Sequence, residues 1–82
     1  MNRPVLDARR LLCPLPVIRT QDRVRDMAPG EQLEIRCTDP GAIHDIPAWC
    51  RMYGHRVIEI REASGEIAIT IEVVSDEGAG RR

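Results

Sequence analysis

Cys13 opens the tetrapeptide Cys13-Pro14-Leu15-Pro16, whose residue types could place a reactive thiol at the start of a helix. Proline fixes its own φ angle and lacks a backbone N–H, so it is tolerated in the first turn of a helix and disfavoured further in. Two prolines at alternate positions therefore predict a helix that begins immediately after Cys13. Because a residue before proline is driven out of the α region, we expect Cys13 at or next to the N-cap, with an extended backbone.

This location predicts an activated thiol. Unpaired N–H groups and the positive end of the helix dipole favour a thiolate over a thiol. A fall of the Cys13 pKa from ~8.5 to ~7 would raise the thiolate fraction at about pH 7.5 from roughly 10% to roughly 75%. The prolines leave donors at Leu15 and Val17, and the nearby Arg9, Arg10 and Arg19 are expected to add to the effect if they point toward the sulfur. The alternative is a small buried cysteine, but the doubled proline favours the reactive thiol.

The other two cysteines, Cys37 and Cys50, carry weaker signals. Cys37 alternates with Leu33 and Ile35, which favours core packing over chemistry. Cys50 lies on an apolar helix stripe, with a redox role as the less favoured alternative. Three cysteines without short paired spacing fit neither a disulfide framework nor a zinc site, so we expect no metal and no cofactor.

The remaining polar candidates have ordinary structural explanations. His44 and His55 lack the spacing of metal ligands, and we expect both in surface or loop positions. Arg19, Arg23 and Arg51 are expected on solvated helix faces; a patch that docks an acceptor is the alternative.

Hydrophobic periodicity then predicts the elements that position these side chains. Apolar residues on one face indicate a helix from Pro14 to about Met27, ended by Pro29-Gly30. Alternating patterns indicate strands, and Ser64-Gly65 indicates a hairpin turn. The expected strands are 4–8, 32–38, 56–63 and 66–74. The order β-α-β-α-β-β predicts an α+β fold, a two-layer α/β sandwich in which both helices cover one face of a four-stranded mixed sheet.

A second helical region follows Asp39, and its prolines predict an interruption. Asp39 is expected as a cap with Pro40 at the first helical position, followed by a short turn to His44. Because Pro47 would break a long helix, a restart is expected with Asp45 as the N-cap. The restarted helix would direct an apolar stripe to the core and stop at Gly54; the stripe comprises Ile46, Trp49, Cys50 and Tyr53.

Length and composition limit the function. Eighty-two residues allow one domain, expected over 1–74, with a flexible polar tail over 75–82. The net charge of −1 argues against non-specific nucleic-acid binding, and the absence of lysine excludes Schiff-base chemistry on a lysine side chain. No apolar stretch predicts a signal peptide or a membrane span. We therefore expect a cytoplasmic protein with reduced thiols and no membrane partner.

Three segments carry a resemblance to a known family. The run Leu6-Asp7-Ala8-Arg9-Arg10-Leu11-Leu12-Cys13-Pro14-Leu15-Pro16-Val17 resembles the opening motif of the TusA/SirA/YedF family of sulfur-carrier proteins. The segment Pro29–Leu33 and the stretch Asp39–Pro47, with its D-P-x-x-x-x-D-I-P pattern, are also similar to family signatures. Together the similar segments cover roughly positions 6 to 60.

The resemblance implies a relay of sulfane sulfur on Cys13. A cysteine desulfurase or a rhodanese would load the thiolate as a persulfide, and the terminal sulfur would pass to an acceptor protein. The destinations it implies are tRNA thiolation, sulfur oxidation and cofactor assembly, without direct nucleic-acid binding. Leu15 stands where tRNA-serving members usually have glutamate, and Arg10 replaces the usual glycine. The competing hypotheses are a regulatory or scaffolding module and a redox thiol sensor.

Overall fold

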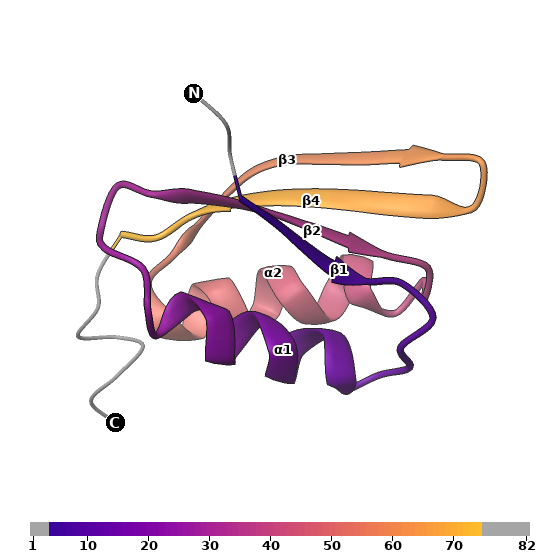
Figure 1. Cartoon of the computed structure of the whole chain (residues 1–82), viewed down its shortest axis with the longest axis horizontal. Coiled ribbons are helices and arrows are strands. Elements are labelled where there is room, and N and C mark those ends of the chain that lie inside the picture. The colour runs from indigo at the N-terminus through magenta and orange to yellow at the C-terminus, as the bar shows by residue number, and fades with distance from the viewer. Residues whose placement is uncertain (1–3, 75–82) are drawn as a thin grey trace.

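The computed structural model describes residues 4–74. The elements follow in the order β-α-β-α-β-β, and both helices lie on one face of the sheet (Figure 1). This confirms the predicted fold class. The strands are β1 (Val5–Ala8), β2 (Gln32–Cys37), β3 (Arg56–Ala63) and β4 (Glu66–Glu72); the helices are α1 (Leu15–Val24) and α2 (Ala42–Tyr53). The predicted tail, 75–82, lies outside the described residues.

The sheet is mixed, with the strand order β1-β2-β4-β3. β1 runs parallel to β2, with Ala8 opposite Cys37 at their carboxyl ends. β4 is antiparallel to both of its neighbours, β2 and β3. Because β1 and β2 are parallel, the chain must cross over between them, and α1 forms that crossover. β3 and β4 are antiparallel and form a hairpin through Ser64 and Gly65, both with positive φ.

An aliphatic core lies between the helices and the sheet. Leu33, Ile35 and Cys37 point from β2 into this layer and face Ile71, Ile69 and Ile67 of β4 directly. Val24 and Met27 pack against them from α1 and the turn that follows it. Ile46, Trp49 and Cys50 pack from α2, with the half-buried Tyr53 beside them. The apolar stripe predicted for α2 is therefore confirmed.

α2 corrects the predicted interruption at Pro47. The helix is continuous from Ala42 to Tyr53 with Pro47 inside it, and its N-cap is Gly41 rather than Asp39 or Asp45. Pro47 removes a single N–H, the one that would reach the carbonyl of Ile43, in the second turn of the helix. Packing of Ile46 and Trp49 against the sheet outweighs that loss, because tertiary burial supplies most of the stability of such helices.

β3 is less buried than its alternating pattern predicts. Ile58 and Ile60 are 45% and 39% exposed, because β3 is an edge strand and the helices do not cover its outer part (Figure 1). The register also shifts between Val57 and Glu59, which leaves Ile58 without a partner on β4.

His55 lies in the loop between α2 and β3, which agrees with the predicted surface or loop placement, but its side chain is buried rather than on the surface. It follows the left-handed Gly54 and stacks on Trp49 with ring centroids 5.1 Å apart. Its Nδ1 accepts a hydrogen bond from the Val74 N–H at 3.3 Å, and its Nε2 has no partner among the described residues. Burial lowers the pKa of His55 below its usual value of 6.5. His44, by contrast, is exposed as predicted.

This burial predicts a loss of stability in acid. The unfolded chain protonates His55 near pH 6.5, whereas the folded state resists protonation to lower pH. The folded state therefore binds fewer protons below that value, and the free energy of unfolding falls as the pH falls from about 7 to about 5. Urea denaturation at several pH values should show that the free energy of unfolding falls less steeply with decreasing pH in His55→Gln than in wild type. His44→Gln is the matched exposed control, and equal slopes in the two variants would contradict the assignment.

Within the described part of the chain, neither helix has the length and apolar character needed to cross a membrane.

Candidate functional site

The topology brings two loops together at one edge of the sheet. β1 and β2 are parallel, so their carboxyl ends lie side by side, and the chain leaves each of them toward a helix start (Figure 1). The loop after β1 contains Cys13, and the loop after β2 contains Asp39. The Arg10 N–H donates to Thr38 Oγ1 at 2.9 Å and joins the two loops. This edge positions the predicted thiol.

Cys13 lies where the paired prolines predict it. Pro14 is the N-cap of α1, so Cys13 directly precedes the helix, and its side chain is exposed. Leu12, directly before the motif, and Leu15, within it, are 71% and 40% exposed. The thiol is therefore accessible from solvent, with apolar side chains next to it.

Two carboxylates contact Cys13, one through its backbone and one through its sulfur. Asp39 Oδ2 accepts a hydrogen bond from the Cys13 backbone N–H at 2.9 Å. Asp45 projects from the first turn of α2, and its Oδ2 accepts the thiol hydrogen bond with an Sγ–O distance of 2.7 Å. Sequence reasoning assigned both residues to helix caps and missed these contacts. Both aspartates are far from Cys13 in the sequence, at separations of 26 and 32 residues, so no local pattern in the chain indicates these contacts.

These contacts reverse the predicted effect on the thiol. The hydrogen bond to Asp45 raises the pKa of Cys13 above its usual value, and desolvation and the negative charges of Asp45 and Asp39 act in the same direction. The expected lowering of the pKa is wrong for the isolated chain. A carboxylate next to a thiol disfavours a second negative charge on the sulfur.

The amide donors expected to stabilise a thiolate are already used. The Leu15 N–H bonds the Leu12 carbonyl at 2.8 Å, and the Val17 N–H bonds the Pro14 carbonyl at 3.1 Å. Arg9 does not serve the sulfur either, because its guanidinium pairs with Asp7 at 2.9 Å and with Glu66 at 3.3 Å. The helix start therefore places the thiol, and the acidic pair sets its protonation.

Arg10 occupies a left-handed backbone conformation, with φ at 69°. A non-glycine residue pays roughly 1–2 kcal/mol in that region. The motif that the sequence resembles usually has glycine here, and a left-handed backbone is the conformation that favours glycine. The bond from the Arg10 N–H to Thr38 holds this conformation.

Cys37 and Cys50 are core residues. Cys37 is fully buried and Cys50 is 1% exposed. Burial is the main cause that raises the pKa of Cys37 to about 11 and that of Cys50 to about 12. The core packing predicted for Cys37 is confirmed. The Cys50 thiol is not accessible from solvent, so the structure does not support the redox role considered for it.

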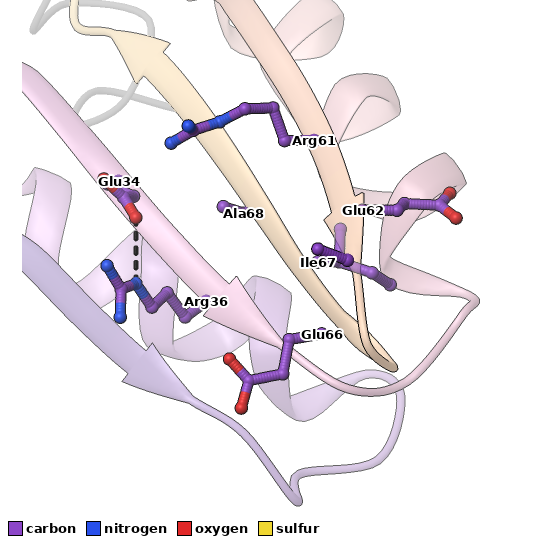
Figure 2. Close-up of a pocket in the computed structure, with 8 residues that line it drawn as sticks. Glu34, Arg36, Arg61, Glu62, Glu66, Ile67 and Ala68 are labelled. Atoms are coloured by element: carbon purple, nitrogen blue, oxygen red, sulfur yellow. Dashed lines mark hydrogen bonds and ion pairs between the residues drawn. The ribbon is translucent and has the colours of Figure 1, made fainter.

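A hollow of about 360 Å³ lies on the sheet face opposite the helices (Figure 2). Arg36 and Arg61 line it, but Arg36 pairs with Glu34 at 2.8 Å and Arg61 with Glu59 at 3.5 Å. No cysteine lines the hollow. It is a solvated face of ion pairs. Among residues 4–74, no three His, Cys, Asp or Glu side chains are grouped so that they could hold a metal ion.

The fold and the site define a class of protein: a small α+β domain that exposes one cysteine at the start of its first helix. Residues 5–73 match the family described as Sulfurtransferase TusA. The sulfur carrier protein TusA of Pseudomonas paraeruginosa is 40% identical over 72 residues, which cover 88% of this chain and 91% of that protein. The chain therefore belongs to the TusA family, as the sequence motifs predicted, and the family supports a sulfur-carrier role with a sulfur donor and a sulfur acceptor.

A second relative agrees with this assignment, and a solved structure has the same fold. YrkF of Bacillus subtilis is 46% identical over 63 residues, which are 77% of this chain and 34% of YrkF. The chain thus spans about a third of that relative's length and most of the length of the Pseudomonas protein. A SirA-like protein of Desulfitobacterium hafniense has the same fold, with a TM-score of 0.76 at 20% identity over 87% of this chain and 97% of its own.

Proposed function

We propose that this protein carries sulfane sulfur as a persulfide on Cys13. The observation that supports it most is the position of the thiol: Cys13 is exposed at the start of α1, while Cys37 and Cys50 are buried. A relay by thiol–persulfide exchange needs an accessible sulfur that can attack and be attacked, and little else from the carrier. The single domain predicted over residues 1–74 is large enough for that task.

The donor and acceptor belong to the same proposal. A cysteine desulfurase or a rhodanese loads Cys13, and a second protein with a reactive thiol receives the sulfur, both in the cytoplasm. The exposed Leu12 and Leu15 give such partners an apolar surface beside the thiol. Leu15, in place of the glutamate usual in members that serve tRNA thiolation, favours sulfur oxidation or cofactor assembly as the destination.

Loading by a desulfurase tests the proposal. The protein is incubated with a cysteine desulfurase and cysteine, quenched without reductant, and its intact mass is measured. Wild type should gain one sulfur atom per chain, and Cys13→Ser should gain none. A wild-type chain that gains no sulfur, with Cys13 unreactive to alkylating reagents, would leave the regulatory or scaffolding module as the better explanation. A mass gain that comes from oxygen on the Cys13 thiol, and not from sulfur, would favour the redox sensor.

A further inference from the structure

The contact between Asp45 and Cys13 joins an acid–base pair across two elements. Cys13 precedes α1, whereas Asp45 lies in the first turn of α2, and their Sγ and Oδ2 atoms are 2.7 Å apart. The neighbouring Asp39 is committed to backbone groups, since its two oxygens accept from the N–H groups of Cys13 at 2.9 Å and Gly41 at 3.4 Å. Asp45 is thus the carboxylate placed on the thiol proton.

This arrangement creates a requirement for the chemistry of Cys13. A thiol attacks sulfur as its thiolate, yet the raised pKa makes release of the proton to solvent unfavourable. The charged groups that act on the thiol are Asp45 from α2 and Asp39 from the β2–α2 loop, and both are acidic. Transfer of the proton within the pair avoids this cost, because the pair keeps a single negative charge when the proton moves from sulfur to carboxylate.

We propose that Asp45 is a catalytic residue that takes the Cys13 thiol proton as Sγ attacks sulfur, and returns it when Sγ leaves. This inference rests on the proposed function. In loading, Sγ forms a bond to the terminal sulfur of the donor persulfide, the donor S–S bond breaks, and its electron pair leaves on the donor thiolate. The Cys13 proton moves to Asp45 Oδ2. The transferred sulfur keeps its oxidation state, so no oxidant is needed.

Discharge is the reverse sequence. A thiolate of the acceptor attacks the terminal sulfur of the Cys13 persulfide, the S–S bond to Sγ breaks, and protonated Asp45 gives its proton to Sγ as it leaves. The carrier returns to the neutral thiol hydrogen-bonded to a carboxylate, which is the arrangement that the structure shows.

The pH dependence of attack on a neutral disulfide tests this role without a sulfur donor. Bis(2-hydroxyethyl) disulfide does not titrate, so its reaction with Cys13 reports the nucleophile alone, and acid quenching with peptide mass analysis follows the Cys13 product. If Asp45 accepts the proton, the wild-type rate constant should change by less than about threefold between about pH 6 and pH 8. In Asp45→Asn the rate constant should fall about tenfold for each unit by which the pH is lowered, because only the free thiolate reacts.

The controls separate this inference from the proposed function. Asp39→Asn removes a negative charge that acts on the thiol, so its rate constant should differ from wild type at every pH. Its pH profile should still be flat, since Asp39 contacts the backbone of Cys13 and not its sulfur. If the wild-type rate constant itself falls about tenfold for each unit by which the pH is lowered, the role of Asp45 is overturned. This result counts even if Asp45→Asn fails to fold. Loss of desulfurase loading with a flat disulfide profile would instead refute the proposed function and leave the proton transfer standing.

Discussion

Iodoacetamide at about pH 7.5 is expected to modify Cys13 and to leave Cys37 and Cys50 intact. The reagent attacks thiolates, and burial, the main cause, raises the pKa of Cys37 to about 11 and of Cys50 to about 12. Their thiolate fractions at about pH 7.5 are then roughly 0.03% and 0.003%, against roughly 10% for an ordinary cysteine. Both sulfurs are also inaccessible in the folded chain.

The expected selectivity therefore combines two effects. Relative to an ordinary cysteine, ionisation alone lowers the reactivity of the buried thiols on the order of several hundred-fold to several thousand-fold. The raised pKa of Cys13 reduces this difference, whereas burial of Cys37 and Cys50 adds the free energy of opening the core. Peptide mass analysis should find one modified cysteine in the folded protein and three in guanidinium chloride, where burial is lost. Modification of Cys50 at a rate similar to Cys13 under folding conditions would contradict the placement of Cys50 in the core and would restore its redox role.

Ile69→Ala is expected to lower the free energy of unfolding by about 2–5 kcal/mol. Ile69 is fully buried on β4, between Ile35 of β2 and Ile60 of β3. Truncation there removes apolar burial and leaves a cavity that the paired strands cannot close. In a domain this small, such a loss is a large part of the total stability.

Ile58→Ala is the matched control, because it makes the same chemical change on an edge strand. Ile58 is 45% exposed and lies at the irregularity in β3, so we expect a loss of less than about 1 kcal/mol. Urea denaturation followed by circular dichroism measures both variants. Equal losses would show that the sheet between β2 and β3 does not form the core described above.

The sequence predicts the fold well where the pattern is local. Alternation in β2 and β4 and the proline-marked start of α1 indicate those elements directly, and β3 has the predicted bounds, Arg56–Ala63. Pro47 misleads because its local penalty is outweighed by the packing of Ile46 and Trp49, which depends on tertiary structure. The exposure of Ile58 and the burial of His55 depend on which strand lies at the edge and on what covers it. A strand pattern does not encode those facts.

The candidate site divides in the same way. The position and exposure of Cys13 follow from Pro14 and Pro16, which act within a few residues. Its protonation depends on Asp45, 32 residues further along the chain. That contact exists because β1 and β2 are parallel and both helices begin at one edge of the sheet. The start of an isolated helix favours a thiolate. Here the Asp45 carboxylate contacts the sulfur directly and has the opposite effect.

The central claim is that sulfur is carried on Cys13. Its most direct test is to locate the sulfur after loading: wild-type protein is charged with a desulfurase and cysteine, digested without reductant, and the peptides are analysed by mass. The peptide that contains Cys13 is expected to carry one extra sulfur, and cyanide is expected to release that sulfur as thiocyanate. An extra sulfur on the peptide of Cys37 or Cys50, or none on Cys13, would contradict it.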